Sequence, residues 1–132
     1  MKRGEIYFTK ETGTGNIQTG YRPVIVIQNN IGNHYSPTTI VCSITSAKKP
    51  PLPTHLFIGK SGGLYKDSTI LCEQIRTINK SDLKIYVGSI SDQTMLKELD
   101  NKILISLGLI EGIAYVERNE FNKRSPNNTK HW

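Results

Sequence analysis

The stretch PVIVIQ, residues 23–28, is a run of β-branched side chains between a proline and the pair Asn29 and Asn30. Such a run is typical of a strand that is buried on both faces of a sheet. Further short strands are expected at residues 5–10, 38–45, 54–58, 68–72 and 85–90, with turn-forming residues between most of them. This spacing favours a mainly β fold of the small barrel or sandwich kind.

A helix is expected after the last of these strands, over residues 92–107. Ser91 is a candidate N-cap, and Asp92 stands in the first turn, where a negative charge is favourable. Apolar side chains then recur every three or four residues, at Met95, Leu96, Leu99, Ile103 and Leu107. This spacing indicates an amphipathic helix, which we expect to pack on the core and to form part of a dimer contact.

The segments between these elements are polar. Residues 9–21 hold three glycines and almost no large apolar side chain, which predicts an exposed loop, and residues 32–37 predict a turn. The loop at residues 48–53 contains three prolines and cannot join a central strand. We therefore expect one domain over residues 1–110, followed by a partly disordered C-terminal extension over residues 111–132.

Length and composition narrow the possible classes of protein. A chain of 132 residues fits one domain, and no segment approaches the roughly 18 apolar residues of a membrane span. The first residues lack the apolar core of a secretory signal, which predicts a cytoplasmic protein without a membrane partner. Cys42 and Cys72 lie in strand-like runs and are expected to be buried free thiols. No histidine stands at metal-ligand spacing, so we expect neither a metal nor a cofactor.

The net charge of +6 is distributed unevenly. Residues 1–60 carry seven basic and two acidic side chains, whereas residues 61–110 carry six of each. A positive surface attracts polyanions, because phosphate groups release counterions when basic side chains neutralise them. The N-terminal half therefore favours a nucleic-acid partner.

Several polar residues stand where packing does not require them. Arg22 directly precedes a proline at a junction between loop and strand, and Thr45 and Ser46 end a strand. A polar run over residues 73–77, EQIRT, follows the strand expected at residues 68–72 and so lies near a strand end. These residues are candidates for a binding or catalytic site, and solvated strand ends are the alternative interpretation.

Six motifs in order along the chain resemble the MazF/PemK family of toxin endoribonucleases, the mRNA interferases of type II toxin–antitoxin systems. They are residues 2–8 (KRGEIYF), 20–29 (GYRPVIVIQN), 33–38 (NHYSPT), 53–55 (PTH), 71–78 (LCEQIRTI) and 105–110 (ISLGLI). Together they span residues 2–110. The proline-rich loop and the extension depart from the family pattern.

The resemblance implies a small SH3-like β-barrel with a C-terminal amphipathic helix, active as a homodimer. It also implies cleavage of single-stranded mRNA at short motifs without a metal, through attack of the 2′-hydroxyl, and inhibition by a cognate MazE-like antitoxin. By position, Arg22 and Thr45 match the catalytic arginine and threonine of the family. An arginine fork and a threonine hydroxyl would stabilise the charge of the pentacovalent transition state, and Arg22 would also donate a proton.

Contacts to RNA are expected from the first loop and from two strand ends. The expected residues are Gly15, Asn16, Gln18, Gly20, Tyr21, Ser46, Glu73, Gln74 and Arg76. Glu73 is the nearest matching carboxylate for a general base, although a pairing with Arg22 or Arg76 explains it equally well, and the base stays unassigned. Two other functions remain open: a non-nuclease toxin or binding module of the same fold, acting on a protein such as DNA gyrase, or a general polyanion-binding protein.

Overall fold

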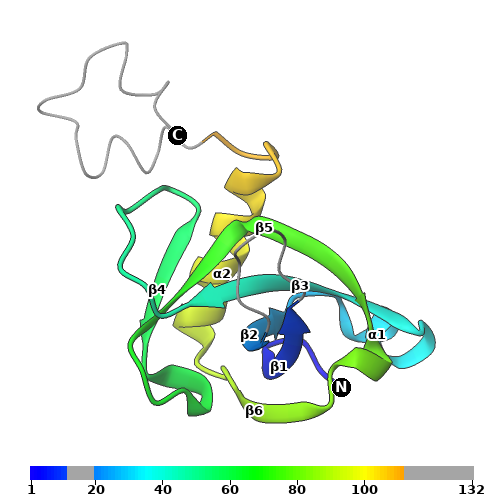
Figure 1. Ribbon diagram of the computed structural model, residues 1–132. Coiled ribbons are helices and arrows are strands. Elements are labelled where there is room, and N and C mark those ends of the chain that lie inside the picture. Colours follow the sequence, from blue (N-terminus) through cyan, green and yellow to red (C-terminus); the bar gives the residue numbers. More distant parts are fainter. Residues whose placement is uncertain (12–19, 112–132) are drawn as a thin grey trace, which may run out of the picture.

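The computed structural model describes residues 1–11 and 20–111. Six strands form one antiparallel sheet in the order β4-β5-β3-β2-β1-β6, and helix α2 packs against it (Figure 1). The strands are β1 (Glu5–Glu11), β2 (Gly20–Val26), β3 (Thr38–Thr45), β4 (His55–Gly59), β5 (Ser68–Asn79) and β6 (Ile85–Ser89). The helices are α1 (Asn30–Tyr35) and α2 (Gln93–Ser106), with short 3₁₀ turns η1 (Ser61–Gly63) and η2 (Lys80–Asp82). The mainly β prediction is confirmed.

Strand β5 carries the bend that curves the sheet into a half-barrel. Along β3, Cys42 pairs with Ile75, but the next residue, Ser43, pairs with Leu71. Three residues of β5 are therefore unmatched, and such a bulge bends a strand and increases its twist. Before the bulge β5 pairs with both β3 and β4, and after it with β3 alone.

Both faces of the central strands are covered, as the β-branched run predicts. On one face the main core includes Ile6, Ile25 and Ile70, and Leu99 of α2 packs into it. On the other face Val24, Val26 and Val41 pack with Leu83. Cys42 and Cys72 are free and buried in the main core, so that prediction is also confirmed.

Helix α1 replaces the turn expected at residues 32–37, and that prediction is wrong. Asn29 caps the helix by accepting from the backbone N–H of Gly32 at 2.8 Å. Asn33, only 2% exposed, accepts from the hydroxyl of Thr39 at 2.7 Å and donates to the carbonyl oxygen of Gln28 at 2.9 Å. Because side-chain hydrogen bonds hold this short helix, an apolar periodicity could not reveal it.

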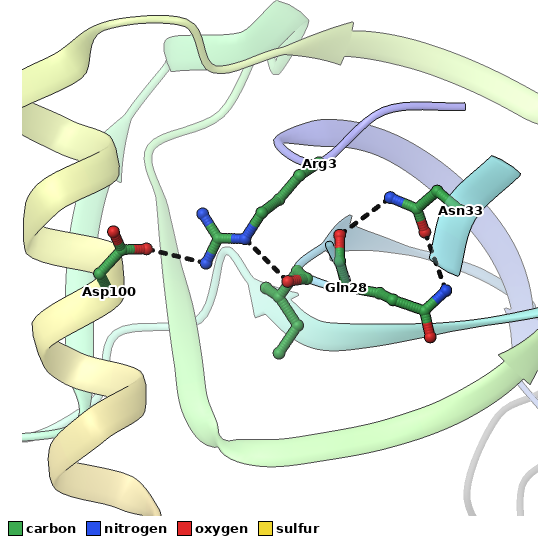
Figure 2. A network of polar contacts seen from close by, with 5 residues as sticks. Arg3, Gln28, Asn33 and Asp100 are labelled. Carbon is green, nitrogen blue, oxygen red and sulfur yellow. Dashed lines mark hydrogen bonds and ion pairs between the residues drawn. The ribbon is translucent and has the colours of Figure 1, made fainter. Parts of the chain in front are cut away.

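Figure 2 shows the contacts that Arg3, in the N-terminal segment, makes with helix α2 and with the residue that follows β2. Arg3 reaches α2, where its guanidinium lies 2.8 Å from the carboxylate of Asp100, and its Nε donates to the carbonyl oxygen of Ile27 at 2.8 Å. The Gln28 and Asn33 pair lies beside it. These contacts fix the end of β2 that lies away from Arg22.

Other boundaries also differ from the predictions. Strand β2 covers Gly20–Val26 rather than residues 23–28, so Arg22 lies inside the strand and not at its junction with a loop. The polar run at residues 73–77 is not beyond a strand end but inside β5, which continues to Asn79. Its side chains are mostly exposed or half-buried after the bulge, so a hydrophobic pattern does not mark them as strand. Helix α2 begins one residue later than expected, because Asp92 rather than Ser91 caps it, accepting from the N–H of Thr94.

Candidate active site

Arg22 and Thr45 come from neighbouring strands of the sheet. The pairing of β2 with β3 ends at Val24 and Ser43, and Arg22 and Thr45 each lie two residues beyond this pair, on the same face of the sheet. In the opposite direction along the sheet, Thr45 pairs with Thr69 of β5, which pairs with Phe57 of β4. Directly opposed residues share a face, so this row points to one side of the sheet.

A pocket of about 410 Å³ opens at this end of the sheet. Arg22, Thr45 and Ser46, three of the residues expected from the sequence, line it together. The other lining residues are Phe8, Pro23, Ile44, Ala47, Leu64, Tyr65, Lys66 and Ser68. We call this space the Arg22 pocket. Its wall combines two cations and several hydroxyl groups with apolar side chains.

The hydroxyl group of Thr45 is oriented by the chain that follows it. Its Oγ1 accepts a hydrogen bond from the backbone N–H of Ala47 at 3.1 Å. A hydroxyl that accepts through its oxygen still has its hydrogen to donate. Arg22 is exposed, and its guanidinium has no ion pair or hydrogen bond within residues 1–11 and 20–111. Both groups can therefore donate to an anion in the pocket.

Glu73 lies outside the Arg22 pocket and forms a separate cluster. Its carboxylate accepts from the hydroxyl of Thr54 at 2.8 Å and contacts Nε2 of His55 at 3.1 Å. Partial burial opposes ionisation, but hydrogen bonds from its own backbone N–H, Thr54 and His55, together with the charge of His55, outweigh it and lower the pKa of Glu73. Its partners are thus Thr54 and His55 and not Arg22.

Gln74 accompanies Glu73 in a second hollow of about 230 Å³. The other lining residues are Lys49, Pro50, Leu52, His55 and Leu71. His55 pairs with Leu71. The pair of Phe57 and Thr69 lies two residues away on the same strands, a distance of about 7 Å. The structure therefore divides the expected site residues between two neighbouring depressions.

Of the remaining residues that were expected to contact RNA, those that the structure describes do not line either depression. Arg76 pairs with Val41, four residues before Thr45 on β3 and so about 13 Å along the strand. Tyr21 is exposed, but it alternates with Arg22 on β2 and does not line the Arg22 pocket, nor does Gly20. Gly15, Asn16 and Gln18 lie outside the described residues, as does the extension after residue 111.

Two pocket residues with functional side chains were missed by the sequence reasoning, Tyr65 and Lys66. Both are exposed and lie in the connection between β4 and β5. The available signal was an aromatic residue directly followed by a basic one, next to a turn that contains Gly62 and Gly63. That signal is weak without the fold that brings the connection to Arg22.

The described ranges contain no group of three or more His, Cys, Asp or Glu side chains that could hold a metal ion. No helix among the described residues has both the length and the apolar character that a membrane crossing requires.

The sequence pattern that defines the PemK-like, MazF-like toxins of type II toxin–antitoxin systems matches residues 2–107. This chain belongs to that toxin family. Among its relatives is Endoribonuclease MazF of Staphylococcus saprophyticus, which is 50% identical over 112 residues, covering 83% of this chain and 92% of the relative. Endoribonuclease EndoA of Bacillus subtilis is 46% identical over 114 residues, covering 84% and 97%.

Solved structures of PemK/MazF toxins share the fold. A mycobacterial endoribonuclease in complex with its cognate antitoxin superposes with a TM-score of 0.69 and 22% identity, covering 83% of this chain and 97% of that one. The MazF chain of a MazE–MazF structure from Deinococcus radiodurans gives a TM-score of 0.68 and 20% identity, with the same coverage. The barrel with a C-terminal helix that the resemblance implied is therefore confirmed.

Proposed function

We propose that this chain is the toxin of a type II toxin–antitoxin pair and acts as an endoribonuclease on single-stranded mRNA. The relatives from Staphylococcus saprophyticus and Bacillus subtilis are named endoribonucleases and are 50% and 46% identical to it over most of their length. The observation that carries the proposal is that Arg22 and Thr45, 23 positions apart in the sequence, line one pocket with a second cation, Lys66.

The proposed reaction is a transfer of the phosphoryl group within the RNA. The 2′-oxygen forms a bond to phosphorus while the bond from phosphorus to the 5′-oxygen breaks. The 2′-hydroxyl loses a proton to a base, and the 5′-oxygen gains one, which we assign to Arg22. The products are a 2′,3′-cyclic phosphate and a 5′-hydroxyl. Fixed donors aimed at the phosphate oxygens lower the barrier because they are already in place when negative charge builds up.

Arg22 and Thr45 suit this task for different reasons. The guanidinium offers several N–H groups in a plane that matches two phosphate oxygens, and it is positively charged until it gives its proton to the 5′-oxygen. The hydroxyl of Thr45 adds one donor whose direction is restricted by the hydrogen bond from Ala47. No Asp, Glu or His of the described residues lines the pocket, so Glu73 is not the base in this scheme.

The proposed partners follow from the family and from the surface. One solved neighbour is a complex with its cognate antitoxin and another is a MazE–MazF complex, which supports a MazE-like antitoxin for this chain. A homodimer in the cytoplasm is the proposed active form. Exposed apolar side chains at the end of α2, on Leu107, Leu109 and Ile110, offer a surface for such a contact.

The test is incubation of the protein with a long single-stranded RNA in EDTA, followed by mapping of the cut ends. We expect cuts at one recurrent short motif with cyclic phosphate ends. The Arg22→Ala variant should lose at least about 100-fold in rate, because one fixed donor at a developing charge contributes roughly that much. Lys97→Ala, which removes an exposed charge on α2, should cleave normally.

Other outcomes would favour the other functions. RNA that stays intact at high protein concentration would contradict the proposal and favour a toxin that acts on a protein such as DNA gyrase. Intact RNA that is bound with a steep salt dependence and no sequence preference would favour a general polyanion-binding protein. Cuts scattered without a common motif would contradict the expected sequence specificity. Normal cleavage by Arg22→Ala would show that the catalytic assignment is wrong.

A further inference from the structure

The connection between β4 and β5 presents one aromatic side chain at the Arg22 pocket. Leu64 points inward and packs on the main core, whereas the next residue, Tyr65, is 78% exposed and lines the pocket. An apolar ring of this size gains nothing from exposure to water. Tyr65 therefore stands ready to contact something that enters the pocket.

The backbone around Tyr65 is held in place on both sides. Gly62 and Gly63 have positive φ angles of 67° and 89°, and a side chain on Gly63 would collide with the carbonyl of Val87 in β6. On the other side, the hydroxyl of the buried residue Ser68 donates to the carbonyl oxygen of Lys66 at 2.8 Å. The connection is thus anchored on β6 before Tyr65 and on β5 after it.

The lining of the pocket fits a nucleotide better than a bare phosphate. Its volume of about 410 Å³ falls within the range of roughly 300–1,000 Å³ that small-molecule sites have. Arg22, Lys66 and Thr45 provide donors for a phosphate group, while Phe8, Pro23 and Leu64 provide apolar surface for a base. Proteins that bind single strands combine these two features, because every base has a flat face that stacks on an aromatic ring.

We propose that Tyr65 is a stacking platform for the base of the nucleotide next to the scissile phosphate, and that the Arg22 pocket holds this nucleotide. This inference rests on the proposed function and adds a substrate-binding residue to it. The phenol ring, and not its hydroxyl group, makes the contact. Tyr65 then contributes to affinity and to the choice of cleavage site, while Arg22 and Thr45 act on the phosphate.

The experiment uses an RNA that carries the mapped cleavage motif, in a cleavable form and in a form with a 2′-deoxy sugar at the cut position. The deoxy form lacks the nucleophile, so it reports binding alone by fluorescence anisotropy. Stacking of one base contributes enough that Tyr65→Ala should weaken binding of this RNA about ten-fold or more. Tyr65→Phe should bind within two-fold of the wild type.

Tyr35 provides a matched control. It is the same residue type, is 79% exposed, and ends α1, beyond the opposite end of β2 from Arg22. Tyr35→Ala should leave binding and cleavage unchanged. Thermal melting and light scattering on every variant show whether the fold and the oligomeric state are kept.

Replacing single bases of the motif by abasic sites locates the contact. At one position next to the cut, removal of the base should make wild type and Tyr65→Ala bind equally, because the stacking partner is gone.

Unchanged binding by Tyr65→Ala, alongside normal cleavage by the wild type, would overturn this inference alone. So would a loss of cleavage by Tyr65→Phe, which would indicate a role for the hydroxyl, or a change of oligomeric state in Tyr65→Ala, which would indicate a protein contact. Failure of the wild type to cut RNA would overturn the proposed function as well.

Discussion

The hydroxyl group of Thr45 offers the sharpest test of the proposed chemistry. Thr45→Val keeps the shape and the strand preference of the side chain but removes the donor. We expect the rate constant for cleavage to fall roughly 10- to 1,000-fold with little change in KM, because the lost hydrogen bond strengthens only as charge develops. Thr45→Ser should keep most of the activity. Single-turnover kinetics on a motif-containing RNA measures this, and an equal loss in both variants would contradict it.

The buried amide of Asn33 governs stability rather than activity. Its replacement by leucine removes the acceptor of the buried Thr39 hydroxyl and the side-chain donor to the backbone carbonyl of Gln28. Each unpaired buried group costs energy, so Asn33→Leu should lower the free energy of unfolding by about 2–4 kcal/mol. Urea denaturation measures the loss. Asn101→Ala, at an exposed position of α2, should change it by less than about 0.5 kcal/mol.

In strand β5, the cluster around Glu73 predicts a pH dependence of stability. The pKa of Glu73 in the folded chain lies below its ordinary value of 4.5. The ionised carboxylate therefore stabilises the fold above pH 4.5, and this contribution disappears as the pH falls through the folded-state pKa.

The comparison with Glu73→Gln isolates this effect. The melting temperature of the wild type should exceed that of the variant at pH 6, and the difference should shrink as the pH falls below 4.5. Melting curves between pH 3 and pH 7 measure it. A difference that stays constant over that range would show that ionisation of Glu73 does not contribute.

The elements of this fold differ in how far the sequence reveals them. The central strands were predictable because Val24, Ile25 and Val26 carry β-branched side chains that local sequence alone identifies. Helix α1 and the second half of β5 were not, because one is held by the buried amide of Asn33 and the other has mostly exposed or half-buried side chains. Helix α1 depends on side-chain hydrogen bonds to Gln28 and Thr39, and the second half of β5 depends on its pairing with β3.

The residues of the candidate site also differ in how far the sequence reveals them. Arg22 and Thr45 were identifiable from the family resemblance, but their meeting in one pocket depends on the register between β2 and β3. Glu73 lies four residues along β5 from Thr69, the partner of Thr45, and this pairing of β3 with β5 is not visible in a sequence pattern. Tyr65 was missed because only the folded connection between β4 and β5 brings it to the pocket.

For the molecule as a whole, the described core is complete before the C-terminal extension begins. Every residue of both core clusters precedes Leu104, and α2 ends at Ser106, where the N–H of Leu107 donates to the carbonyl of Ile103. The family pattern likewise ends at residue 107. Folding and cleavage should therefore not require residues 112–132.

Deletion of residues 112–132 tests this directly. The shortened chain should melt within a few degrees of the full one, cut RNA at the same motif, and keep the same number of subunits by light scattering. The deletion removes four basic and two acidic side chains, so RNA affinity should fall only modestly through the weaker general attraction. The matched control is a full-length chain in which Lys123 and Arg124 are replaced by glutamine, which lowers the net charge by the same two units as the deletion. If the shortened chain loses cleavage while this control keeps it, the extension contributes to the site through more than its charge, and the boundary of the functional domain lies beyond residue 111.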